Sequence, residues 1–242
     1  MDTKDLGFES KLIHAGMFDD QFGSATVPIY QTSTFRFKSA DHGADCFSGV
    51  SDGYIYTRLN NPTIDALEKL TASLENGTRA IAVSSGMGAV NTLYMGLLQQ
   101  GDHMVSTAAV YGPSRVVMEK HYSKFGIESS YVDTSDAANI EAAIRPNTKL
   151  IYIETPSNPT MALTDLEAVV RIARKHGIKT VIDNTFCSPY LQKPLDYGFD
   201  VVFHSITKFL NGHADIVGGI IISREKEMDD ILRPMMRNLG CN

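Results

Sequence analysis

The chain has 242 residues, of which 43% are hydrophobic and 21% are charged, with a net charge of −6 and a pI near 5.6. This composition is typical of an ordinary globular protein, and an acidic balance without any dense Lys/Arg cluster argues against a nucleic-acid surface. No apolar stretch is long enough to cross a bilayer and the N-terminus lacks the pattern of a signal peptide, so we expect no membrane association.

The first 60 residues predict an irregular arm. Scattered Gly, Pro, Ser and Thr interrupt any helical period, and one short strand-like stretch runs from Thr32 to Phe37. An arm of that length needs a surface to lie on, so we expect residues 1–60 to contact a neighbouring subunit.

A helix is predicted directly after the arm. Asn61 suits an N-cap and Pro62 suits the first helical turn. One apolar face follows, made by Ile64, Leu67, Leu70 and Leu74. The pair Asn76-Gly77 closes the helix after about Glu75.

Strands and helices then alternate to the end of the chain. We predict strands near 79–84, 103–107, 128–133, 149–154, 179–183, 200–204 and 219–223, and helices near 87–99, 113–125, 136–144, 164–177 and 226–237. Most of these strands are continuous apolar runs, which is typical of a sheet covered on both faces. The spacing predicts an α/β domain over residues 61–242, with a mostly parallel seven-stranded sheet covered by helices on both faces.

Polar residues gather where these strands end. They form the segments Ser84-Ser85-Gly86, Glu154-Thr155-Pro156-Ser157-Asn158-Pro159, Asp183-Asn184-Thr185 and Ser205-Ile206-Thr207-Lys208. Because open α/β sheets bind ligands outside the carboxyl ends of their strands, this edge is the predicted binding site.

Lys208 and Asp183 give the most specific chemical signal in the chain. A lysine and an aspartate at the ends of successive buried strands are what pyridoxal phosphate chemistry needs. The amine forms a Schiff base with the cofactor aldehyde, and the carboxylate keeps the pyridine nitrogen protonated. A lysine after a strand is more often a solvated loop residue, so this interpretation depends on the residues around it.

Four of these residues suit a phosphate group. Gly86 and Met87 lie between a strand and a helix, where free N–H groups and the helix dipole favour an anion. The same segment also suits a plain tight turn or the remnant of a dinucleotide-binding loop. The third glycine of the dinucleotide fingerprint is missing. The hydroxyls of Ser205 and Thr207 can donate to a phosphate or cap backbone groups.

Tyrosine side chains add two further candidates. The ring of Tyr111 can stack on a flat heterocycle and its hydroxyl can move a proton, although a tyrosine there more often packs in the core. Tyr56 and Arg58, at the end of the arm, suit a phosphate brought from outside the sheet, or a surface salt bridge.

The three cysteines carry little signal. Cys46, Cys187 and Cys241 form no CxxC pair and leave an odd number, so we expect no disulfide, no metal site and a reducing, cytoplasmic environment. Cys187, four residues past Asp183, fits a packed thiol better than a reactive one.

Taken together, these motifs resemble the Cys/Met-metabolism family of pyridoxal-phosphate enzymes, which has the aspartate-aminotransferase fold (fold type I). The resemblance covers nearly the whole chain, and the lysine and Tyr-x-Arg segments are its most specific parts. The matching segments are Ile13-His14-Ala15-Gly16, Pro28 to Phe35, Tyr54 to Thr63, Ser85-Gly86-Met87, Glu154 to Pro159, Asp183 to Phe186, Ser205 to Lys208 and Asn211-Gly212-His213.

The resemblance implies a role for each candidate. Lys208 would hold pyridoxal 5'-phosphate and then shuttle protons between substrate carbons, and Asp183 would pair with the pyridinium nitrogen. Tyr111 would stack on the ring and assist proton transfer to the leaving group. The phosphate would be bound by Gly86, Met87, Ser205 and Thr207. Tyr56 and Arg58 would reach the phosphate in the neighbouring subunit's site, which implies a homodimer and, usually in this family, a homotetramer.

The implied activity is that of a carbon–sulfur lyase. It would act by γ-elimination on methionine, cystathionine or homocysteine, giving a thiol, a 2-oxo acid and ammonia. There are two alternatives: a γ-replacement transferase acting on an acylated homoserine, and a truncated non-catalytic homologue. Family members have a smaller C-terminal domain that we expect to be absent from this chain. Pro113 also stands where methionine γ-lyases carry cysteine and the cystathionine enzymes carry glycine.

Overall fold

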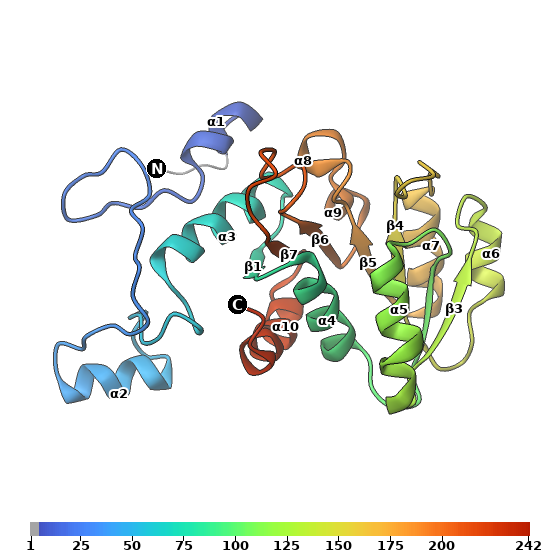
Figure 1. Ribbon diagram of the computed structural model, residues 1–242, viewed down its shortest axis with the longest axis horizontal. Helices are drawn as coiled ribbons and strands as arrows, with labels where there is room; N and C mark the ends of the chain where they lie inside the picture. The colour runs from blue at the N-terminus through green and yellow to red at the C-terminus, as the bar shows by residue number, and fades with distance from the viewer. Residues whose placement is uncertain (1–4) are drawn as a thin grey trace.

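A seven-stranded sheet is the centre of the computed structural model, which describes residues 5–242. The strands are β1 (Arg79–Val83), β2 (His103–Thr107), β3 (Glu128–Val132), β4 (Thr148–Glu154), β5 (Lys179–Asp183), β6 (Val201–Ser205) and β7 (Gly219–Ser223). Their order in the sheet is β1-β7-β6-β5-β4-β2-β3 (Figure 1). β7 runs antiparallel to both of its neighbours and every other pair is parallel. The prediction of a mostly parallel seven-stranded sheet is confirmed.

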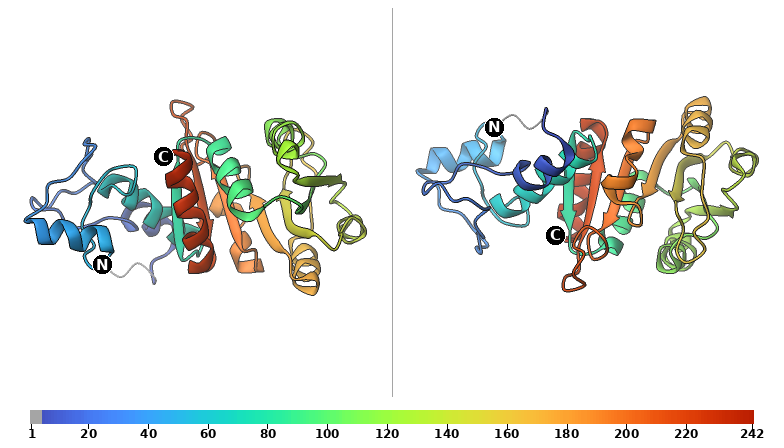
Figure 2. Two further views of the ribbon diagram at one scale, coloured as in Figure 1. Left: turned by 90° about the horizontal axis from the view of Figure 1, so that it is seen from below. Right: turned by 90° about the horizontal axis from the view of Figure 1, so that it is seen from above.

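Helices cover both faces of this sheet. One face carries α4 (Gly86–Leu97), α5 (Gly112–Lys120) and α10 (Lys226–Leu239); the other carries α3 (Pro62–Leu74), α6 (Ala137–Ala142), α7 (Leu166–His176) and α9 (Pro194–Tyr197). Figure 2 shows α5 and α7 on opposite sides of the strands. Successive residues of β7 alternate between the two cores, with Ile221 in one and Ile220 and Ile222 in the other. No helix between residues 5 and 242 is long and apolar enough to span a bilayer.

Side-chain caps explain where the main helices begin. Asn61 accepts the N–H of Thr63 at 2.9 Å and starts α3 at Pro62, as the sequence predicts. Ser85 accepts the N–H of Gly88 at 3.0 Å and starts α4. α4 thereby begins directly at the carboxyl end of β1.

The arm contradicts two of the predictions. It contains two helices that the sequence pattern did not indicate, α1 (Phe8–His14) and α2 (Ala40–Ser48). The stretch from Thr32 to Phe37 forms no strand, and its Thr34 makes only an isolated bridge to Tyr56. Both helices are short, and no residue of α1 is buried, so they lack the long apolar period by which helices are found.

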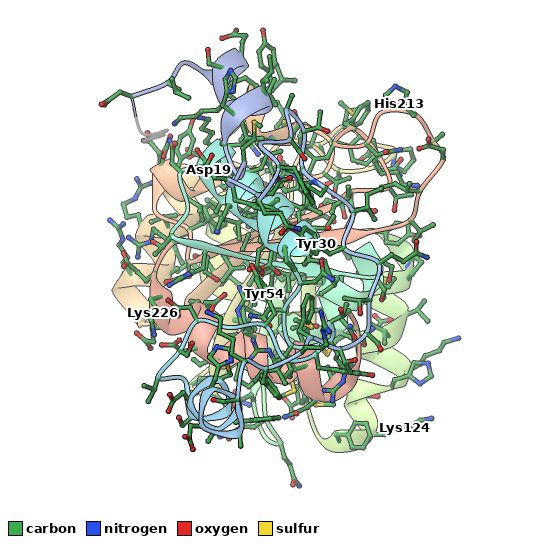
Figure 3. The ribbon with its side chains drawn as sticks, turned by 90° about the vertical axis from the view of Figure 1, so that its left-hand side faces the viewer. Asp19, Tyr30, Tyr54, Lys124, His213 and Lys226 are labelled. Carbon is green, nitrogen blue, oxygen red and sulfur yellow. The ribbon has the colours of Figure 1, made fainter. Side chains whose placement is uncertain are left out.

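The arm is fastened to its own domain near the start of α3. Tyr30 N–H donates to Thr63 Oγ1 at 2.9 Å, and Asn61 Nδ2 donates back to the Tyr30 carbonyl at 2.9 Å. The Tyr54 hydroxyl donates to Asp65 Oδ2 at 2.7 Å, and both tyrosines are seen on this side of the molecule in Figure 3. α1 lies against α3, whereas the segment that carries α2 lies away from the sheet (Figure 1). The arm leaves large apolar side chains exposed, such as Phe22 and Ile29.

Candidate active site

The carboxyl edge of β4, β5 and β6 brings the main candidates together. Glu154 and Asp183 are register partners on β4 and β5, and Asp183 is paired with Phe203 of β6. Two residues further on, Ser205 ends β6, and the Lys208 N–H donates to the Ser205 carbonyl at 3.2 Å. Lys208 therefore lies one tight turn past the end of β6, which is the strand next to Asp183 on β5. Its side chain is exposed and has no ion-pair partner among residues 5–242.

Asp183 keeps one carboxylate oxygen available. Its Oδ1 accepts the Thr185 N–H at 3.0 Å and also the Thr185 hydroxyl. Its Oδ2 has no donor in the described part of the chain, so this oxygen can accept a hydrogen bond from a protonated ring nitrogen. Burial raises the pKa of Asp183, and the hydrogen bonds from Thr185 oppose that rise. A cation bound against Oδ2 would favour the ionised carboxylate.

The beginning of α4 offers an anion site beside Ser205. Ser85 occupies the Gly88 N–H, whereas the N–H groups of Gly86 and Met87 have no acceptor within residues 5–242. A Cβ atom on Gly86 would lie 2.9 Å from Ser205 Cβ and 3.1 Å from Ser205 Oγ. Glycine is therefore what allows α4 and β6 to approach this closely. Unpaired N–H groups at a helix N-terminus, next to a hydroxyl, suit a phosphate.

Thr207 is occupied by the backbone. Its Oγ1 accepts the Gly218 N–H at 3.1 Å and donates to the Gly218 carbonyl at 3.3 Å. Of the two roles that the sequence allows for this hydroxyl, phosphate binding or backbone capping, the structure shows the capping role. It holds the turn before β7. The Ser205 hydroxyl, in contrast, has no hydrogen-bond partner among the described residues.

Tyr111 lies on the rim of the same edge. It is the N-cap residue of α5, and its side chain is 46% exposed, so one part of the ring is open for stacking. Its backbone N–H donates to Glu154 Oε2 at 2.6 Å. That bond ties the loop after β2 to the end of β4, and it keeps the tyrosine near Asp183.

Tyr56 and Arg58 are held by contacts with each other and with α10 in the single chain. Arg58 Nη1 donates to the Arg237 carbonyl on α10 at 2.8 Å, and the guanidinium carbon lies 5.6 Å from the centre of the Tyr56 ring. Within residues 5–242 neither side chain has a hydrogen bond to Gly86, Ser205 or Lys208. Their role in a neighbouring subunit's site therefore stays a prediction.

Glu154 is the residue of the site to which the sequence analysis assigns no role. It is buried, and besides Tyr111 it binds the Asn158 N–H through Oε1 at 3.1 Å. Burial, followed by the negative charge of Asp183, raises the pKa of Glu154 to about 7. Its position at the end of a long apolar strand was the available signal. The sequence does not show that both oxygens receive backbone N–H groups.

Cys187 lies beyond the edge and has the character of a packed thiol. Burial, and then the charge of Glu75, raise the pKa of its thiol, which disfavours the reactive thiolate. In residues 5–242 no group of three or more His, Cys, Asp and Glu side chains is placed to hold a metal ion.

Comparison with known proteins gives a family match over residues 9–242, to the Cys/Met metabolism PLP-dependent enzymes. An L-methionine gamma-lyase of Treponema denticola is 46% identical over 228 residues, which are 93% of this chain and 57% of that protein. A cystathionine gamma-lyase of Bacillus subtilis is 46% identical over 230 residues, covering 95% of this chain and 58% of its own. The crystal structure of metB from Corynebacterium glutamicum superposes with a TM-score of 0.93 at 41% identity, covering 100% of this chain and 61% of that one.

The chain thus spans about three fifths of the length of the curated relatives it matches. The match nevertheless covers the whole sheet and every site residue described above. The fold agrees as well, since the solved structures share it over the full chain. This chain belongs to the family of Cys/Met metabolism PLP-dependent enzymes.

Proposed function

We propose that this chain forms the cofactor-binding part of a pyridoxal-phosphate-dependent carbon–sulfur lyase. The activity would be γ-elimination on a sulfur amino acid (methionine, cystathionine or homocysteine), giving a thiol, a 2-oxo acid and ammonia. The observation that supports it most is that an exposed lysine, a partly buried carboxylate with one free oxygen and unpaired helix N–H groups lie at one sheet edge. The names of the two gamma-lyase relatives support the choice of reaction.

The donor set fits the three parts of the cofactor. Asp183 Oδ2 can hold the ring nitrogen, and the Gly86 and Met87 N–H groups with Ser205 Oγ can hold the phosphate. When bound, the pyridoxal ring delocalises the negative charge left on a substrate carbon after proton removal. Lys208 offers Nζ as the amine for attachment and as the base that removes and returns protons at adjacent carbons. Tyr111 would cover the ring and pass a proton to the departing sulfur.

The same proposal extends to assembly. Residues 1–60 would form an arm that contacts a neighbouring subunit, and residues 61–242 would form the cofactor-binding domain. Tyr56 and Arg58 would complete the neighbour's phosphate site in a homodimer, and two dimers would form a tetramer. Support for this comes from the exposed apolar side chains of the arm and from Arg58, which binds the Arg237 carbonyl and makes no hydrogen bond to the described residues around Lys208.

Attachment of the cofactor is the direct test. After mixing with pyridoxal 5'-phosphate and reduction with borohydride, peptide mapping should find the label on Lys208. Lys208→Ala should keep its fold but lose both the label and the visible absorbance band of the bound cofactor. A matched control is Lys193→Ala, because Lys193 lies between the short helix α8 (Ser188–Leu191) and α9, with its amine over the Phe8 ring. Label on Lys193 in place of Lys208 would refute the proposed site.

Product analysis separates elimination from replacement. A lyase should release ammonia and a 2-oxo acid from methionine or cystathionine without any second nucleophile. If product formed only when a thiol and an acylated homoserine were both supplied, the γ-replacement reaction would be the correct one.

A further inference from the structure

Glu154 joins three parts of the candidate site, although the proposed reaction assigns it no role. It ends β4, receives the Tyr111 N–H at 2.6 Å and the Asn158 N–H at 3.1 Å, and lies in register beside Asp183. Only 2% of its surface is exposed. A buried carboxylate with two backbone donors and a second, partly buried carboxylate alongside is a costly arrangement in the absence of a nearby cation.

We propose that Glu154 is a positioning residue of the cofactor site, which holds the Tyr111 ring in place and places a second negative charge beside the Asp183 carboxylate. This inference rests on the proposed function, because the cation that would use the second charge is the protonated ring nitrogen of the cofactor.

The positioning role follows from the two hydrogen bonds. Tyr111 has no side-chain cap and begins α5 with an exposed ring, so its backbone N–H is the atom that fixes the ring's place on the rim. Glu154 Oε2 holds that N–H, and Oε1 holds the loop that follows β4 at Asn158. Charge-assisted hydrogen bonds of this kind are about twice as strong as neutral ones.

The electrostatic role follows from the neighbours that face Glu154. Asp183 on β5 is the nearest acid, and Tyr94 on α4 and Tyr152 on β4 are buried tyrosines whose pKa values are raised well above normal, so they stay neutral. His204 on β6 acts on Asp183 rather than on Glu154. Burial, and after it the neighbouring Asp183 carboxylate, raise the pKa of Glu154 to about 7, since two acids side by side do not both ionise easily.

Binding of a cationic ring against Asp183 should lower the pKa of Glu154 again. The cation favours the ionised form of Glu154, so binding releases a proton wherever Glu154 is still protonated in the free protein. The sign follows directly: cofactor affinity should rise as the pH rises through about 7 and level off above it. The cofactor phosphate also titrates, but it does so equally in the wild type and in the Glu154 variants.

Glu154→Gln tests both roles. The neutral amide can accept only one of the two N–H groups and carries no charge. Above about pH 8 we expect it to bind pyridoxal 5'-phosphate about tenfold more weakly than the wild type, a ratio that should shrink as the wild-type carboxyl becomes protonated below about pH 6. Calorimetry in two buffers of different ionisation enthalpy should show fewer protons released. Glu141→Gln, which alters an exposed carboxylate on α6, should match the wild type in both measurements.

Glu154→Asp separates charge from reach. It keeps an ionisable carboxyl but is too short to reach the Tyr111 N–H in the same geometry. The pH dependence of binding should return, while the visible circular dichroism of the bound cofactor should differ from the wild type because the Tyr111 ring has moved.

The outcomes distinguish the inference from the proposed function. If the wild-type chain takes no label on Lys208, the proposed function fails. If the wild type is labelled and Glu154→Gln has the same affinity, pH profile and proton release, the cofactor site stands and the role of Glu154 is refuted.

Discussion

Gly86, which follows β1, and Ser205, at the end of β6, lie close together although they are distant in the sequence. They can lie this close because glycine has no side chain: a methyl group on Gly86 would lie 2.9 Å from Ser205 Cβ. A candidate catalytic lysine such as Lys208 can be recognised from its sequence motif. The sequence also indicates Gly86 as a phosphate candidate, but its close contact with Ser205 is visible only in the folded chain.

Gly86→Ala should weaken cofactor binding much more than it weakens the fold. The added methyl group pushes Ser205 away from the phosphate position, whereas alanine gains helix propensity, so the free energy of unfolding should change by less than about 1 kcal/mol. We expect at least about tenfold weaker binding of pyridoxal 5'-phosphate, measured by titration of the visible absorbance band.

Gly88→Ala is the matched control in the same helical turn. Its added Cβ would make ordinary contacts of 3.4 Å or more, and its N–H is already held by Ser85. Cofactor affinity should therefore be close to that of the wild type. Equal losses in both variants would show that helix α4, and not the contact with Ser205, explains the effect.

At the scale of elements, caps and long apolar runs made the domain predictable from its sequence. α3 begins at Pro62 and β5 ends at Asp183 as the residue pattern indicates, because these elements contribute continuous apolar surface to a core. α1 and α2 could not be found, since short helices that bury little leave no apolar period. The antiparallel direction of β7 could not be predicted from the local sequence either, because it depends on the path of the loop after Lys208.

Asn61 joins an element to the arm, so removing it should cost more than the loss of a simple cap. Its Oδ1 caps α3, while its Nδ2 donates to the Tyr30 carbonyl and to Thr57 Oγ1. Asn61→Ala should lower the free energy of unfolding by about 2 kcal/mol or more, measured by urea denaturation. It should also speed proteolysis within the arm.

Asp136→Ala provides the comparison, because Asp136 caps α6 through a single exposed hydrogen bond to the Ala138 N–H. Its expected cost is about 1 kcal/mol, without faster cleavage of the arm. If the two variants lost the same stability, the bonds from Asn61 to the arm would contribute nothing.

For the whole molecule, the arm determines the expected state of assembly. Phe22 and Ile29 are 84% and 83% exposed in the single chain, and apolar groups exposed in this number favour burial against a second protein surface. We expect the chain to sediment as a dimer or larger species, and the double substitution Phe22→Ser with Ile29→Ser to shift it toward monomer.

Phe125→Ser serves as the control at this scale. Phe125 is also largely exposed, but it lies in the 3₁₀ helix Tyr122–Phe125 of the domain, away from the arm. Sedimentation of this variant should be unchanged. A wild-type chain that is monomeric at all concentrations would overturn the proposed role of the arm.

The pairing of the first strand with the last also has a consequence for biosynthesis. β1 has β7 as its neighbour, and Arg79 is aligned with Ser223 across the pair. A ribosome needs roughly 10 s to add the intervening stretch at typical elongation rates. Throughout that delay the nascent β1 has an unsatisfied hydrogen-bonding edge, which makes the emerging polypeptide a natural client for a chaperone until translation reaches β7.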